Sequence, residues 1–164
     1  KMRNCYLTFL SRLKLTLKVH HQFHIKLFKN DMLFKQKKSE RKVVVKNDVR
    51  DGIISYCKIN HPNGMVLILK GKSKNSIMEI NGLVIPPFDH IGPTFAGFPA
   101  SFLPLDLSYI GIVHSHPTGS EKPLIEELNN FFGLVLLTVK SPYNDDDIFA
   151  WDSSGNQISL TFSD

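Results

Sequence analysis

The chain has 164 residues, of which 42% are hydrophobic, which suits one compact domain with its own core and gives no reason to expect two. Its two cysteines, Cys5 and Cys57, exclude a disulfide framework and a four-cysteine zinc site. No apolar run approaches the roughly 20 residues of a membrane-spanning helix. The first ten residues contain CYLTFL, an apolar stretch shorter than the core of a signal peptide. We therefore expect a soluble, cytoplasmic protein in a reducing compartment, with no membrane partner.

The formal net charge of +5 is concentrated at one end of the chain. Residues 1–31 hold seven Lys/Arg and one Asp, whereas residues 32–164 hold thirteen Lys/Arg and fourteen acidic residues. We predict a basic N-terminal extension over 1–42, solvated or poorly ordered, and a single domain over 43–164. Met32 is a more usual start for such a chain, so the residues before it are expected to be an upstream extension. A basic arm could contact nucleic acid, although we do not expect that partner.

The first elements along the chain are a possible strand and a well-marked helix. Residues 13–19 alternate apolar and polar side chains, and residues 43–45 are three valines, so both suit strands. A helix is predicted to begin at Asn47-Asp48, with Val49, Ile53 and Cys57 forming an apolar stripe at helical spacing.

Further strands and turns follow, separated by one more helix. HPNG (61–64) is turn-forming, GKSKNS (71–76) is a hairpin-like connection, and SSGN (153–156) suits a tight turn. A short helix is predicted from Pro123 through Phe132. Strands are predicted over 65–70, 77–85, 109–116, 134–139, 148–152 and 158–162. Helices between buried strands indicate an α/β sheet domain.

Residues 86–107 are rich in Pro, Gly and Phe and show no clear period. A long loop with aromatic side chains often shapes a binding surface, and this one would then lie beside a site. The alternative is a segment that covers the core. The sequence leaves both interpretations open.

The strand over 109–116 ends in two histidines, His114 and His116, followed by Pro117. Strand side chains alternate between faces, so both imidazoles project to one side while Ser115 points away. Two imidazoles on one face could begin a zinc site, and a third ligand could come from Glu126 or Glu127 in the first turn of the next helix. Ordinary strand-end polarity would explain the histidines equally, and carboxylates also complement a helix dipole.

HSHP at the end of a strand, followed by a loop and a carboxylate-bearing helix, resembles the JAMM (MPN+) family of zinc metalloproteases. The resemblance to archaeal-type single-domain members extends to five further segments: KINHPNG, VLILKGK, LVIPPF, LPLDLSYIGIVHSHP and SPYNDDDIFAWDSSGN. The resemblance covers about 43–164. It implies a cytidine-deaminase-like α/β sandwich, with a mixed sheet flanked by helices. It also implies hydrolysis of isopeptide bonds to ubiquitin-like proteins.

The family's site is His-x-His-Pro, with seven residues between the second His and a Ser, then two more and an Asp. An upstream Glu acts as general base, the Ser stabilises the oxyanion, and the two His and the Asp hold zinc. The resemblance makes His114, His116 and Glu127 the zinc ligands here, with Glu127 one methylene longer than the Asp. It places Ser115 among the catalytic-motif residues.

Two of the family's catalytic positions lack the required side chain. Related sequences read His-Pro-Asn-Glu where this chain reads His-Pro-Asn-Gly. Gly64 therefore occupies the general-base position and provides no proton acceptor. The Ser position is Leu124, which could alternatively serve to pack a helix face with Leu128 and Phe131. Because a positioned base contributes ~10²–10⁴-fold, we expect weakened catalysis.

Two other groups could replace the missing base, and neither is favoured by the sequence. Glu79 lies on the next predicted strand, and His90 lies in the aromatic loop. Glu126 is expected to point to solvent, about 100° around the helix from Glu127. The functional expectation is a weakened JAMM-type isopeptidase; the alternative is a non-catalytic MPN-type binding or scaffold domain.

Overall fold

The computed structural model describes residues 40–87, 90–91 and 96–164, except for the side chains of residues 90, 91 and 96. All the described residues belong to one compact unit, Glu40–Asp164. The predicted strand over 13–19 and the basic arm up to Ser39 lie outside them. Among the described helices, none combines the length and the apolar character needed to cross a membrane.

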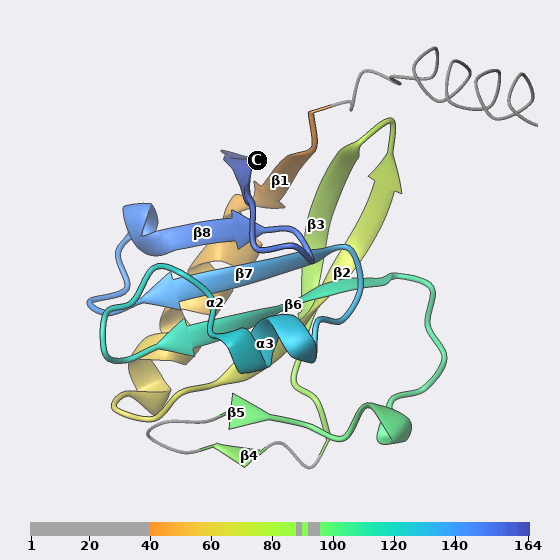
Figure 1. Ribbon diagram of the computed structural model, residues 1–164. Helices are drawn as coiled ribbons and strands as arrows, with labels where there is room; N and C mark the ends of the chain where they lie inside the picture. The colour runs from red at the N-terminus through yellow and green to blue at the C-terminus, as the bar shows by residue number, and fades with distance from the viewer. Residues whose placement is uncertain (1–39, 88–89, 92–95) are drawn as a thin grey trace, which may run out of the picture. The chain divides into compact units, whose positions relative to one another are not determined.

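One seven-stranded mixed sheet forms most of the domain (Figure 1). Its strands are β1 (Lys42–Lys46), β2 (Val66–Lys74), β3 (Ile77–Val84), β6 (Tyr109–His116), β7 (Val135–Lys140), β8 (Ile148–Trp151) and β9 (Gln157–Ser163). They lie in the order β1-β3-β2-β6-β7-β8-β9, and β1 also pairs with β9, so the sheet closes on itself. β6 and β7 run parallel, whereas β2 runs antiparallel to β6. The predicted mixed sheet is confirmed.

Helices are fewer than the predicted helix-flanked sandwich requires. The described residues contain two α-helices, α2 (Asn47–Asn60) and α3 (Ile125–Asn129), and two 3₁₀ turns, η1 (Ala100–Phe102) and η2 (Asp145–Asp147). In Figure 1, α3 lies on one side of β6 and β7 and α2 lies on the other. The sheet is therefore covered by one long helix, a single helical turn and loops.

The face of the sheet that α2 covers, called the inner face here, carries the larger core. The predicted stripe of Val49, Ile53 and Cys57 is confirmed, since all three side chains are buried. Burial raises the pKa of the Cys57 thiol to about 12, so this sulfur packs as a neutral apolar group. The stripe packs with Val43, Val45, Met65, Leu67, Leu69, Ile80, Val113, Val135, Leu137 and Val139, among others.

The opposite face of the sheet, the outer face, carries a smaller apolar cluster. Val66, Ile112, Leu136 and Trp151 form its buried centre. Phe98, Leu128, Phe131, Phe132 and Phe149 pack against that centre. Leu124 lies outside this cluster and is 46% exposed, so the proposed packing with Leu128 and Phe131 does not hold for it.

Two elements differ in length from their predictions. The helix predicted over 123–132 is only Ile125–Asn129, and Pro123 precedes the N-cap residue Leu124 instead of opening the helix. Strand β2 continues to Lys74, because the hairpin turn needs only two residues. Asn75 and Ser76 both have positive φ, as the two-residue turns that match the strand twist require.

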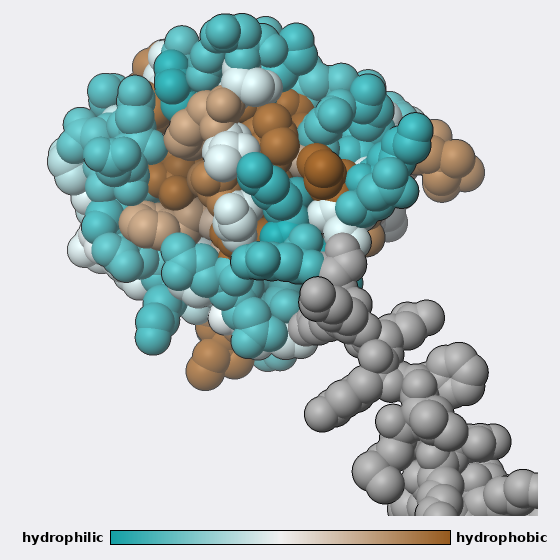
Figure 2. All heavy atoms as spheres, turned by 90° about the horizontal axis from the view of Figure 1, so that it is seen from above, coloured by the Kyte–Doolittle hydropathy of each residue, from teal (hydrophilic) through white to brown (hydrophobic). Residues whose placement is uncertain are grey.

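Residues 86–107 are described in part. They include the short antiparallel pair β4 (His90–Ile91) and β5 (Ala96–Gly97), followed by η1. After η1, Leu105 and Leu107 are almost fully exposed. Seen from above, hydrophilic residues cover most of the domain and surround a hydrophobic area (Figure 2).

Candidate metal centre

Strand β6 delivers both predicted histidines to the outer face. His114 pairs in register with Thr138 on the parallel strand β7, and His116 pairs with Lys140. Neighbouring residues of paired strands point to the same side, so these four side chains share the outer face. Both imidazoles are buried, and the prediction that they lie on one face is confirmed.

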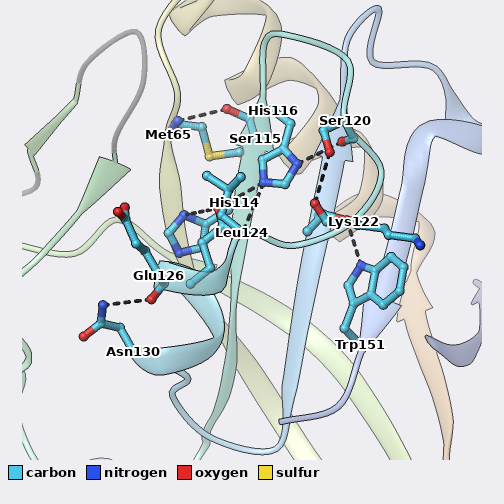
Figure 3. Close-up of polar contacts among 12 residues, drawn as sticks. Met65, His114, Ser115, His116, Ser120, Lys122, Leu124, Glu126, Asn130 and Trp151 are labelled. Atoms are coloured by element: carbon cyan, nitrogen blue, oxygen red, sulfur yellow. Dashed lines mark hydrogen bonds and ion pairs between the residues drawn. The ribbon is translucent and has the colours of Figure 1, made fainter. Parts of the chain in front are cut away.

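The loop after β6 fixes the orientation of the His116 ring. The Nδ1 atom of His116 lies 2.9 Å from the carbonyl oxygen of Ser120 (Figure 3). A carbonyl oxygen can only accept, so Nδ1 carries the proton and donates it. The Nε2 atom then faces away from the loop. Metal-binding histidines commonly use one ring nitrogen in this way and the other as the ligand.

The single turn of α3 brings Glu127 against both imidazoles. Its Oε1 atom lies 3.0 Å from His116 Nε2 and 3.4 Å from His114 Nδ1. Its Oε2 atom accepts a hydrogen bond of 2.8 Å from the backbone N–H of Leu124, which is the N-cap residue of α3. Glu127 therefore joins the start of the helix to the histidine pair.

The charges of these three groups are coupled. Burial lowers the pKa of His114, and the nearby Glu127 only partly opposes that effect. Burial also disfavours charge on His116, but the hydrogen bond and charge of Glu127 outweigh it and raise the pKa. Burial would raise the pKa of Glu127, yet the His116 hydrogen bond and the two imidazoles lower it. Without a cation, the arrangement favours a protonated His116 facing an ionised Glu127.

The ligand types at this site suit zinc, although the carboxylate lies in contact with the imidazoles. Within the described part of the chain, no three His, Cys, Asp or Glu side chains form a group ready to hold a metal ion. Glu127 contacts both imidazoles directly instead. Two imidazoles and a carboxylate are nevertheless the ligands of one class of catalytic zinc site. With bonds of ~2.0–2.1 Å, tetrahedral neighbours lie about 3.3 Å apart, close to the two contacts made by Glu127.

Gly64 lies where the register would direct a side chain toward His116. Val66 on β2 pairs with His114, and the Ser115 backbone N–H donates to the Met65 carbonyl, so the next step places Gly64 opposite His116. Opposed residues of antiparallel strands share a face. A side chain at this position would therefore point to the outer face, toward the histidines, where Gly64 presents only backbone.

Ser115 lies between the histidines with its side chain on the inner face. Its hydroxyl oxygen accepts a hydrogen bond of 2.9 Å from the Met65 backbone N–H, and its own N–H donates to the Met65 carbonyl (Figure 3). These bonds fasten the start of β2 to the end of β6. Ser115 thus holds Gly64 beside His116, and a direct catalytic part for its hydroxyl stays a prediction.

The alternative bases are placed differently. Glu79 pairs with Lys72 at 3.0 Å on the β2–β3 hairpin, and it is not among the residues around the histidines. The side chain of His90 lies outside the described residues. Glu126 is exposed, as predicted, and it lies at the edge of the cavity beside Glu127.

A cavity of about 680 Å³ opens beside the histidine pair. Its polar side is formed by the histidines and α3, and its apolar side by the outer-face cluster. The lining residues include Gly64, Val66, Phe98, Ile112, His114, His116, Ser120, Leu124, Glu126, Glu127, Asn130, Phe131 and Phe132. A volume of this size lies within the range of small-molecule and peptide side-chain sites.

Sequence reasoning missed the groups that hold the loop between β6 and α3. The hydroxyl of Thr138 donates to the carbonyl of Glu121 at 2.6 Å and accepts from the indole N–H of Trp151 at 2.8 Å. Trp151 is the single tryptophan of the chain, which was a signal that a buried N–H would need a partner. The Ser120 carbonyl has no sequence signal, because every residue has a carbonyl group.

Comparisons with known proteins identify one related sequence and two structures of similar fold. No protein-family model matches the chain. A probable metalloprotease from Haloferax volcanii is 28% identical over 134 residues, which cover 77% of this chain and 83% of the relative.

Two solved structures share the fold, each with a TM-score of 0.54. One, described as a JAMM metalloprotease-like zinc site in the proteasome and signalosome, is 22% identical over 76% of this chain and 99% of its own. The other, a JAB1/MPN domain protein from Archaeoglobus fulgidus, is 24% identical over 73% of this chain and 98% of its own. In sequence the chain is thus distantly similar to an archaeal probable metalloprotease, and it shares its fold with the JAMM and JAB1/MPN domain structures.

Proposed function

We propose that the outer face carries a zinc site of the JAMM/MPN type whose hydrolytic chemistry is weakened. His114, His116 and Glu127 would hold the metal. The observation that carries the proposal is the orientation of His116, which gives its Nδ1 proton to Ser120 and turns Nε2 toward a carboxylate. Two acceptors can face each other only with a proton or a cation between them, and a divalent cation would suit both imidazoles and Glu127 together.

When bound, zinc would polarise a scissile carbonyl and lower the pKa of its water ligand toward ~7. The chain's own residues supply the ligands, orient them and shield them in a cavity. Glu126 and Glu127 are the carboxylates among the described lining residues, and Glu127 is already used by the imidazoles. Gly64 offers no side chain to take a proton from the water.

The missing groups determine the expected rate. A positioned general base contributes ~10²–10⁴-fold. An oxyanion donor contributes ~10²–10³-fold in well-studied enzymes, and Leu124 offers an apolar side chain in its place. The two losses are not additive when the groups act together. Either alone would reduce a modest isopeptidase to slow turnover. We propose that any substrate is a peptide tail joined through an isopeptide bond, of the ubiquitin-like kind.

The second candidate function is binding without hydrolysis. Leu124 lines the cavity, whose other wall is aromatic, and Leu124 and the next residue, Ile125, are both exposed at the start of α3. Apolar surface of this kind supports contact with a partner protein. A binding domain would keep its partner affinity when the zinc ligands are replaced, whereas a peptidase would lose its activity.

Metal content provides the first test. Protein purified without chelators should contain about one zinc per chain, and the variants His116→Gln and Glu127→Gln should contain almost none. Thermal unfolding should shift upward with added zinc in the parent chain only. A parent chain with no zinc and no thermal shift would remove the metal site and leave the binding function.

Restoring the missing base provides the second test. Gly64→Glu should raise cleavage of an isopeptide-linked ubiquitin-like conjugate by ~10²-fold or more, since the register directs the new carboxylate to the outer face. Gly64→Gln is the matched control, because it has similar size and no proton-accepting carboxylate. Chelator-sensitive turnover in the parent chain as fast as in Gly64→Glu would contradict the proposed weakening.

A further inference from the structure

We propose that Thr138 is a positioning residue for the zinc site, acting with Trp151 through the loop that orients His116. The inference rests on the proposed metal function, because its consequence is expressed in zinc affinity. Thr138 lies outside the His-x-His-Pro motif and does not contact the ligand atoms of the site.

The hydrogen bonds at Thr138 have one possible direction. The indole N–H of Trp151 can only donate, and the carbonyl of Glu121 can only accept. The Thr138 hydroxyl lies between them and can do both, so its proton is committed to Glu121. Thr138 is fully buried and Trp151 nearly so, which makes an unpaired N–H or carbonyl here costly.

Two neighbouring carbonyl groups of the loop accept hydrogen bonds from the sheet. Ser120 and Glu121 are consecutive, and their carbonyl oxygens accept from His116 on β6 and from Thr138 on the adjacent strand β7. In Figure 3, the indole of Trp151 turns its nitrogen toward the loop that carries Ser120 and Lys122. Two successive peptide groups are thus fixed from two neighbouring strands.

At its start the loop is also held to β6, because the Gly119 N–H donates to the His116 carbonyl at 3.0 Å. The side-chain contacts of Ser120 and Glu121 are weaker anchors. Glu121 pairs with Lys140 at 2.7 Å, but its side chain is about half exposed, and exposed ion pairs contribute little. The Ser120 hydroxyl donates to the Lys122 carbonyl at 3.2 Å within the same loop, so it does not join the loop to the sheet. Thr138 therefore provides the buried link that keeps the Ser120 carbonyl in reach of His116.

The expected consequence is a change in metal binding. Removing the hydroxyl frees the Glu121 carbonyl, and the Ser120 carbonyl moves with it. The Nδ1 proton of His116 then loses its partner, and Nε2 is no longer held as the ligand. Partners of this kind typically affect metal affinity by ~10–100-fold.

The test compares Thr138→Val, which keeps the shape without the hydroxyl, with Thr138→Ser, which keeps the hydroxyl. Zinc affinity, measured by competition with a chromophoric chelator, should fall ~10–100-fold in Thr138→Val and return to near the parent value in Thr138→Ser. Thr161→Val is the matched control. Thr161 also donates to a carbonyl, that of Val43, but it lies on β9 and outside the cavity lining. Its zinc affinity should equal that of the parent.

A second readout needs no metal. In the zinc-free chain, the Nδ1 proton resonance of His116 should be visible by NMR while the Ser120 carbonyl protects it from exchange. It should broaden or disappear in Thr138→Val, and Trp151→Phe should weaken it through loss of the indole donor. A parent chain that binds no zinc but shows this change would refute the metal function and keep the positioning role. Parent-like zinc affinity and an unchanged resonance in Thr138→Val would overturn the inference. If Thr138→Val does not fold, the same two measurements on Trp151→Phe decide the question.

Discussion

The two faces of the sheet use the same strands for different purposes. On β7, Leu137 points to the inner face and packs in the core with α2, whereas the next residue, Thr138, points to the outer face and bonds a loop. On β6, Val113 likewise points to the inner face and His114 to the outer face. The inner face is held by apolar burial, and the outer face by a few directed hydrogen bonds around a cavity.

The comparison shows how one sheet can separate stability from a site. Apolar burial is non-directional and tolerates small shifts. A metal site requires donors within tenths of an ångström, so it depends on bonds with fixed geometry. Alternation along each strand assigns the two requirements to different residues. If the separation is real, changes on one face should leave the property of the other intact.

The largest expected effect is on the inner face. Leu137→Ala removes a fully buried side chain and should lower the free energy of unfolding by ~2–5 kcal/mol. Urea unfolding of the zinc-free protein measures the change. Zinc affinity of the folded fraction should stay at the parent value. A parallel loss of zinc affinity would show that the two faces are coupled.

A substitution on the outer face should change zinc affinity more than it changes stability. Glu127→Gln keeps the size of the side chain and an oxygen for the Leu124 N–H, but removes the negative charge beside both histidines. We expect zinc affinity to fall by more than about 100-fold, because replacing a ligand costs more than replacing a residue that only hydrogen-bonds to a ligand. The unfolding free energy in the presence of chelator should change much less than in Leu137→Ala. Retained zinc with unchanged affinity would exclude Glu127 as a ligand.

The inner face could largely be predicted from the sequence. The bounds of the strand over 109–116 agree with β6, and the stripe on α2 agrees with the observed burial, because both follow from local periodicity. The helix predicted over 123–132 was too long for the same reason. Leu128 and Phe131 follow a helical period, but they join the outer cluster around a turn that ends at Asn130.

The candidate site could be predicted only in part. Alternation placed His114 and His116 together, and the family resemblance added Glu127. The Thr138 link depends on the parallel pairing of β6 with β7, which joins residues far apart in the sequence and leaves no local pattern. The orientation of His116 depends on a backbone carbonyl, which every residue has.

A smaller effect is expected at the start of α3. Leu124 has the extended backbone of an N-cap, and Glu127 three residues later already accepts its N–H. A serine at this position could return the bond to the backbone N–H of Glu127 and complete a capping box. Leu124→Ser should therefore raise stability by about 0.5–1 kcal/mol, less the partial burial lost. Leu124→Ala loses the same burial without a cap, so it should be less stable than Leu124→Ser.

The smallest effect concerns a partly exposed anchor, Asp106, near the end of the segment 86–107. Asp106 accepts hydrogen bonds from the side chain and backbone of Ser108 and pairs with Lys70 at 3.0 Å, and these contacts lower its pKa to about 2. Because the folded-state pKa is depressed, the contribution of Asp106 is complete above its ordinary value of ~3.9 and is lost as pH falls through about 2. Asp106→Asn should therefore flatten the acid limb of the stability profile between those values and leave zinc affinity at neutral pH unchanged. Titration of the Asp106 carboxyl by NMR checks the premise, and a midpoint near 4 would show that the contacts with Ser108 and Lys70 do not stabilise its ionised form.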